Sequence, residues 1–139
     1  MDGLRFRMRV AVLWVAVAVA LVGSVALFVY EAGALEERLA GEAEGKPLDD
    51  SARFSLTAMV LLPLVMVGVT LLLGDRINRY VNVVAGLALG IVGVFLAGGE
   101  LLGGELHSHV LPTVLAIVFA FIIAGLGVLE LRQRAATAH

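Results

Sequence analysis

The chain has 139 residues, of which 60% are hydrophobic and only 16% are charged, with a mean hydropathy of +1.00 and a formal net charge of −2. Soluble domains carry roughly a quarter of charged residues, so this composition favours a membrane protein. The weak net charge gives no reason to expect a nucleic-acid partner, and the lack of cysteine excludes disulfides, thiolate metal sites and cysteine nucleophiles.

Four apolar runs follow one another along the chain, over residues 10–30, 54–73, 81–97 and 110–129. A helix of about 20 residues crosses the hydrocarbon core of a bilayer, and in lipid a helix satisfies all of its own backbone amides. The sequence therefore predicts an all-α fold, a polytopic integral membrane protein with four transmembrane helices in a compact bundle, as a single domain over residues 1–139. A cleaved signal peptide is disfavoured for the first run because such apolar segments span roughly 7–15 residues.

The charged residues of the connections predict the orientation of these spans. The connection 31–53 is long and acidic, and nine of the twelve acidic residues fall on its side of the four-span arrangement. Seven arginines fall on the opposite side, namely Arg5, Arg7, Arg9, Arg76, Arg79, Arg132 and Arg134. Since basic residues stay in the cytoplasm, we expect a multi-pass protein of the cell inner (plasma) membrane with cytoplasmic N- and C-termini and 31–53 as an outer loop.

Small residues and one proline predict how the helices pack. Gly86 and Gly90 form a GxxxG pattern that lets two helix backbones approach closely in lipid. This pattern fits packing within the chain as well as a homo-oligomer, and both readings stay open. Pro63 lies near the middle of the second run, where it should kink the helix.

Three segments occur in a distinctive order: "EAGALEERLAG" after the first run, "LLPLVMVGVTLLL" with Pro63 and Met66, and "RINRYVNVVAG" with Asn78, Arg79 and Asn82. In these features the chain resembles a family of small bacterial four-helix membrane proteins of unknown function. The resemblance covers roughly the first two thirds of the chain. It supports the four-span architecture, and it brings no activity with it.

Ionisable residues near the outer ends of the spans are the candidates for chemistry. Glu31, Glu100 and Glu105 are the candidate catalytic residues, because a carboxyl at the lipid boundary can serve as a general acid or base on a lipophilic substrate. Glu105, His107 and His109 form an alternative, a divalent metal site, since imidazole and carboxylate suit zinc and its neighbours. The third reading is a solvated turn, because the stretch "GGELLGGELHSHVLP" is rich in glycine.

At the inner side, Arg76 and Arg79 either anchor the helices or contact an anionic lipid headgroup. We therefore expect a small integral membrane protein that acts as an accessory or interaction component and needs no cofactor. The alternative is a membrane-embedded enzyme of isomerase, cyclase or hydrolase type that acts on a lipophilic small molecule. The expected partners are the lipid bilayer, such a small molecule, and a second copy through Gly86 and Gly90.

Overall fold

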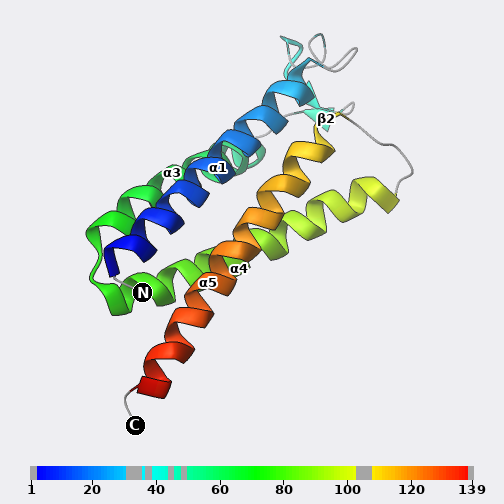
Figure 1. Ribbon diagram of the computed structural model, residues 1–139. Helices are drawn as coiled ribbons and strands as arrows, with labels where there is room; N and C mark the ends of the chain where they lie inside the picture. Colours follow the sequence, from blue (N-terminus) through cyan, green and yellow to red (C-terminus); the bar gives the residue numbers. More distant parts are fainter. Residues whose placement is uncertain are drawn as a thin grey trace.

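The computed structural model describes residues 3–30, 36, 39–43, 46–47, 50–102 and 108–137, with side chains at 3–30, 36, 39–41, 54, 57–99, 102 and 108–136. Four long helices dominate the described part: α1 (Gly3–Val29), α3 (Asp50–Leu72), α4 (Asp75–Leu102) and α5 (Val110–Thr137). The connection after α1 holds a minimal antiparallel ladder of β1 (Glu42–Ala43) and β2 (Lys46–Pro47). The predicted all-α class is confirmed (Figure 1).

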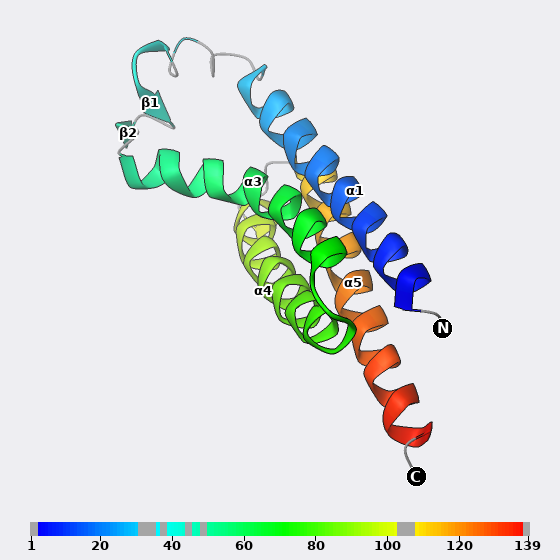
Figure 2. The same cartoon turned by 90° about the vertical axis from the view of Figure 1, so that its left-hand side faces the viewer.

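The four helices form a compact bundle in which α1 packs on both α3 and α5, and α4 packs mainly on α5. The contact between α3 and α4 is much less extensive, although the two follow each other in the chain. The start of α1 and the end of α5 lie at the same end of the bundle (Figures 1 and 2). We name this the terminal end, and the opposite end the loop end.

Glycines of α4 explain its close contact with α5. A Cβ at Gly86 would lie 2.7 Å from the Ala120 carbonyl oxygen, and one at Gly90 would lie 2.9 Å from the Phe121 ring. Such distances leave no room for a side chain, so α5 of the same chain already covers both residues of the GxxxG pattern. A homo-oligomer stays a prediction, but these glycines are occupied within the chain.

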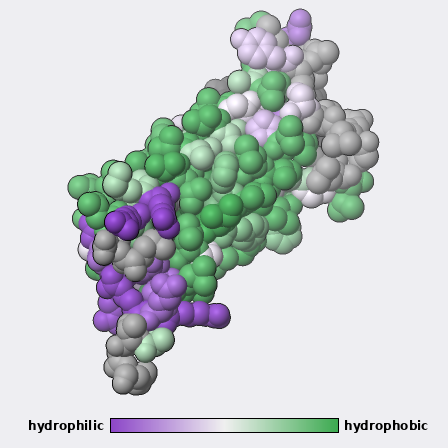
Figure 3. Space-filling view, viewed as in Figure 1, coloured by the Kyte–Doolittle hydropathy of each residue, from purple (hydrophilic) through white to green (hydrophobic). Residues whose placement is uncertain are grey.

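The outer surface of the helices is apolar over the middle of the bundle, and hydrophilic residues gather at the terminal end (Figure 3). In the described part, three helical stretches are long and apolar enough to cross a membrane: Gly3–Val29, Asp75–Gly99 and Val110–Ala136. A shorter apolar stretch, Thr57–Leu72, lies in α3. The core between the helices is built around Trp14, Val17 and Ile123, which are fully buried.

Pro63 lies inside α3, which continues as a helix on both sides of it. Proline has no backbone N–H, so the Met59 carbonyl four residues earlier receives no helical hydrogen bond. Figure 2 shows α3 bent along its length, with its first half turned away from α1. The bend separates the loop-end half of α3 from its neighbours, and the hollows described below lie there.

Candidate functional site

A buried group of polar side chains joins three helices on the terminal side of the core. The Trp14 indole N–H of α1 donates to Asn82 Oδ1 of α4 at 2.6 Å, and the Thr70 hydroxyl of α3 donates to the same oxygen at 3.0 Å. Asn82 Nδ2 donates to Asn78 Oδ1 at 2.6 Å, and Asn78 Nδ2 donates to the Thr70 carbonyl at 3.0 Å. These four fully buried residues hold the ends of α3 and α4 against α1.

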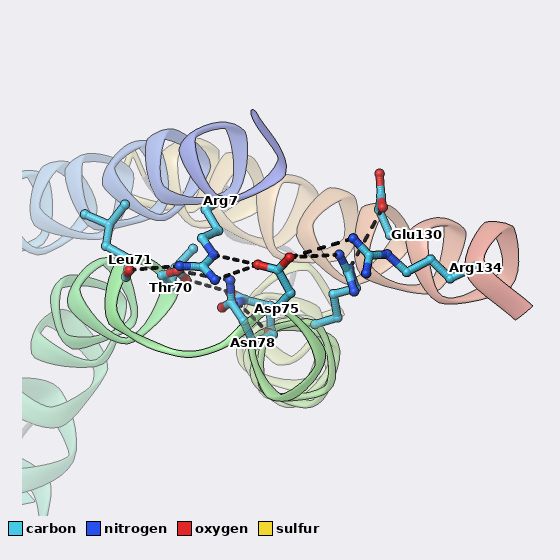
Figure 4. A network of polar contacts seen from close by, with 9 residues as sticks. Arg7, Thr70, Leu71, Asp75, Asn78, Glu130 and Arg134 are labelled. Atoms are coloured by element: carbon cyan, nitrogen blue, oxygen red, sulfur yellow. Dashed lines mark hydrogen bonds and ion pairs between the residues drawn. The ribbon is translucent and has the colours of Figure 1, made fainter. Parts of the chain in front are cut away.

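Next to this group, arginines from three helices surround the carboxylate of Asp75. Arg7 of α1 donates from Nε and Nη2 to Asp75 Oδ1, at 3.0 and 2.5 Å. Asp75 Oδ2 lies 3.7 Å from Arg134 Nη2 of α5 and 4.0 Å from Arg79 Nη2 of α4. Figure 4 shows Asp75 between Arg7 on one side and Arg134 on the other. We call Arg7, Asp75, Arg79, Glu130 and Arg134 the arginine cluster.

Gly3 allows this approach at the start of α1. A Cβ at Gly3 would overlap the Asp75 carboxylate, so the carboxylate lies directly against the α1 backbone. The first turn of a helix carries partial positive charge and attracts an anion. Asp75 therefore sits where both the helix end and the guanidinium groups favour its charge.

The innermost members of the cluster form a buried ion pair. Arg79 is 2% exposed and Glu130 is 3% exposed, and Arg79 Nε lies 3.9 Å from Glu130 Oε2. The Arg79 guanidinium also lies over the Phe6 ring, 5.6 Å from its centre. Among the described residues, Arg79 Nε, Arg79 Nη2 and Glu130 Oε1 have no hydrogen-bond partner. The pair is thus close enough for electrostatic attraction but too far apart for hydrogen bonds.

At the loop end, a second polar group borders an apolar pocket. Ser24 Oγ of α1 lies 2.9 Å from the His109 carbonyl oxygen and 2.7 Å from Thr113 Oγ1 of α5. Thr113 Oγ1 lies 3.0 Å from the same carbonyl. The His109 ring packs edge-on against Phe28 at 5.1 Å. The pocket has a volume of about 200 Å³ and draws residues from all four helices: Leu21, Ser24, Val25, Phe28, Met59, Val60, Leu96, Ala97, His109 and Thr113.

This Ser24–His109 pocket adjoins a larger apolar hollow of about 540 Å³ between α3 and α4. Met59 and Leu96 line both spaces, and the hollow is completed by Ala58, Leu62, Ala88, Leu89 and Val92. The hollow lies beside Pro63, where the bent α3 leaves α4. Together the two spaces offer a hydrocarbon-lined site with hydrogen-bonding groups at one end, which is the general form of a ligand pocket.

The candidate residues from the sequence are only partly placed by the structure. Glu31, Glu105 and His107 lie outside the described residues, and Glu100 belongs to α4 with its side chain outside them. Their proposed roles in acid–base chemistry stay predictions. The described residues contain no group of three metal-ligating side chains, and His109, the one described member of the metal alternative, is buried at the pocket.

The two arginines expected to contact a headgroup differ in their surroundings. Arg76 is exposed, whereas Arg79 is buried and lies between the carboxylates of Asp75 and Glu130. A headgroup contact stays a prediction for both, but Arg79 can reach a headgroup only if the arginine cluster opens. Glu130 of α5 faces Arg79 of α4 across the interface between the two helices.

Several residues of these sites are recognisable in the sequence as polar residues within apolar runs, although a hydropathy average does not reveal them. Ser24, Thr70 and Asn82 are isolated polar residues within apolar runs. In lipid such residues seek partners on neighbouring helices, so their burial is foreseeable while their partners are not. Asn78 lies inside α4, which begins at Asp75, and its side chain belongs to the buried polar group.

A helical bundle, whose described part has apolar helices long enough to cross a membrane and hydrophilic side chains at the terminal end (Figure 3), defines the class of this protein as helical and membrane-like. Within that class, the chain belongs to the family described as "Family of unknown function (DUF6326)", which matches residues 2–136. The expected membership in an uncharacterised family is confirmed, and the match also covers the last third of the chain. No curated protein and no solved structure matches the chain.

Proposed function

We propose that the protein is a four-span accessory component of a bacterial plasma membrane that holds a lipophilic small molecule in the Ser24–His109 pocket. The observation that carries the proposal is the pocket itself, which is lined by apolar residues of four helices and bordered by two hydroxyl groups. The adjoining hollow between α3 and α4 accommodates a hydrocarbon tail. The Pro63 bend supports this function because it parts the two helices beside the hollow.

The hydrogen bonds at the pocket suggest the chemistry of the polar end of the ligand. The Ser24 and Thr113 hydroxyl groups each carry one proton. Both protons can be donated within the group formed by these two hydroxyl oxygens and the His109 carbonyl oxygen. The hydroxyl oxygens keep lone pairs that accept hydrogen bonds. A ligand with a hydroxyl donor at one end and a hydrocarbon tail fits this arrangement.

Photolabelling tests the pocket directly. A long-chain alcohol carrying a diazirine in its tail is incorporated into vesicles with the purified protein, and mass spectrometry locates the labelled residues. We expect labels on residues of the pocket and of the adjoining hollow, and their loss in Ala97→Phe, which fills the pocket. Val94→Phe, on the exposed face of α4, is the matched control. Equal labelling of both variants, or labels spread evenly over the exposed apolar side chains, would reject the pocket.

The four-span topology needs a separate test, which the absence of native cysteine makes simple. Single-cysteine variants Ser108→Cys, before α5, and Ala136→Cys, near the end of α5, are treated in intact cells with a membrane-impermeant maleimide. We expect S108C to react in intact cells and A136C to react only after permeabilisation. The opposite pattern would overturn the cytoplasmic placement of the termini.

The enzyme alternative is separated from binding alone by three single variants, Glu31→Gln, Glu100→Gln and Glu105→Gln. If the protein only holds its ligand, folding and photolabelling survive all three changes. If one variant keeps its fold and its labelling but no longer replaces the unchanged protein in cells, the result supports acid–base chemistry by that carboxyl group.

A further inference from the structure

The buried guanidinium group of Arg79 presents two N–H donors that lack an acceptor. Nε and Nη2 lie on one edge of the planar group, and this edge commonly binds a carboxylate through two parallel hydrogen bonds. Within the part of the chain that the structure describes, neither atom makes a hydrogen bond, and Glu130 Oε1 makes none either. Arg79 and Glu130 are 2% and 3% exposed, so bulk solvent does not satisfy them. Since buried polar groups in folded proteins are nearly always hydrogen-bonded, these three atoms point to a bound partner.

Two carboxylates lie near this edge of Arg79, and both are too far away for a direct hydrogen bond. Nε lies 3.9 Å from Glu130 Oε2, and Nη2 lies 4.0 Å from Asp75 Oδ2, whereas a hydrogen bond between nitrogen and oxygen spans about 2.7–3.2 Å. Because the guanidinium group lies between the two carboxylates, a shift toward one lengthens the distance to the other. Polar groups more than about 3.5 Å apart are the ones that a water molecule can bridge.

The packing of the helices keeps these gaps open. A Cβ at Gly127 would lie 2.5 Å from Val83 Cγ2 and 3.4 Å from the Arg79 carbonyl oxygen, so α5 already touches α4 at this level. Gly127 and Glu130 are three residues apart and share one face of α5. From α1, the Phe6 ring packs against the Arg79 guanidinium group, 5.6 Å from its central carbon. The helices therefore cannot move together to turn the gaps into direct hydrogen bonds.

The charges around the gaps select the kind of molecule that fits. An anion at this edge would lie between the carboxylates of Asp75 and Glu130, and a cation would lie against the Arg79 guanidinium group. A neutral molecule must accept hydrogen bonds from the guanidinium edge and donate them to the carboxylates. Water does both, and buried water molecules typically make about three hydrogen bonds to groups that otherwise have no partner.

We propose that ordered water bridges Arg79 Nε to Glu130 and Arg79 Nη2 to Asp75. This water bridge connects three helices, because Asp75 of α4 also accepts hydrogen bonds from Arg7 of α1, and Glu130 belongs to α5. Water-mediated hydrogen bonds are nearly as favourable in enthalpy as direct ones, so the bridge satisfies the buried charges without closer contact. The inference does not depend on the Ser24–His109 pocket, which lies at the loop end.

NMR spectroscopy of the full chain in detergent micelles tests the water bridge. Protein labelled with nitrogen-15 arginine gives one signal for each Nε–H group, and the Arg79 signal is the one that disappears in Arg79→Lys. If R79K does not fold, Phe6→Leu identifies the signal, because the ring that lies against the guanidinium group shifts its frequency. We expect a cross-peak between the Arg79 Nε–H proton and water that has opposite signs in laboratory-frame and rotating-frame spectra, as dipolar contact with a bound water requires.

An exposed arginine of the same chain is the matched control. Arg132 is exposed, so its Nε–H should show only the peak of proton exchange with bulk solvent, which has the same sign in both spectra. If the Arg79 signal has no water cross-peak, or only an exchange peak like that of Arg132, the water bridge is overturned. Since photolabelling of the Ser24–His109 pocket is read independently, either proposal can fail alone.

Discussion

The indole N–H of Trp14 and the side-chain oxygen of Asn82 lie 2.6 Å apart, and this bond joins α1 to α4 across 68 positions of sequence. Both residues are fully buried, so neither group has water as an alternative partner. The bond forms part of the polar group that also includes Thr70 and Asn78. It explains why the lone tryptophan of an apolar helix faces the interior rather than the membrane interface, where tryptophan is otherwise favoured.

Removal of this bond should destabilise the bundle measurably. Trp14→Phe keeps an aromatic ring but removes the N–H that donates to Asn82 Oδ1. We expect a loss of about 1–2 kcal/mol in the free energy of unfolding. Unfolding in mixed micelles with rising dodecyl sulfate, followed by circular dichroism, measures it. The double-mutant cycle of W14F and Asn82→Ala should give a coupling energy of about 0.6 kcal/mol, the average for hydrogen bonds inside membrane proteins. A coupling energy of zero would mean that the bond adds nothing to stability.

The packing of α4 against α5 makes a second prediction. Gly86→Ala places a Cβ 2.7 Å from the Ala120 carbonyl oxygen, and the helices must separate to admit it. We expect a cost of about 1–3 kcal/mol, which is usual for overpacking. Gly68→Ala in α3 is the control, because a Cβ there meets nothing within 4 Å in the described part of the chain. That change should raise stability by about 0.5–1 kcal/mol, and a similar loss for both variants would contradict the packing role of Gly86.

The helical architecture can be predicted from the sequence, because each apolar run has the length of a membrane span and only a helix satisfies the backbone amides of such a run in lipid. The helices nevertheless extend beyond the predicted spans at the terminal end, where α1 begins at Gly3 and α5 continues to Thr137. Hydropathy cannot foresee this, since arginine-bearing turns are polar yet remain helical at the membrane boundary. The run that ends at residue 97 likewise continues in α4 to Leu102.

The sites are less predictable, because they depend on rotation of the helices about their axes. Polar residues of one span meet partners that lie tens of residues away, as Ser24 meets His109. The sequence places Arg79 and Glu130 at the same side of the membrane, but many helix rotations satisfy that placement. Only packing decides that Arg79 points inward at Glu130 while Arg76 points outward.

The buried pair of Arg79 and Glu130 makes the third prediction. Glu130→Gln removes the nearest counter-charge of a guanidinium group that is 2% exposed, and loss of one partner of a buried pair costs roughly 3–5 kcal/mol. We expect E130Q to lower the free energy of unfolding by an amount in that range. The double variant Arg79→Met with Glu130→Leu removes both charges and should be more stable than E130Q. If the double variant has the lower free energy of unfolding of the two, the charged pair itself stabilises the bundle, and this prediction is wrong.

Pro63 gives the last prediction, because it connects the bend of α3 with the proposed ligand pocket. Pro63→Ala restores an N–H that can bond to the Met59 carbonyl, so α3 should straighten and close toward α4. We expect the free energy of unfolding to stay the same or rise, while photolabelling of the Ser24–His109 pocket falls severalfold. The matched control is Pro112→Ala in the first turn of α5, where a backbone N–H has no helical partner to gain. We expect P112A to keep its photolabelling. If P63A keeps its photolabelling as well, the pocket does not depend on the bend of α3.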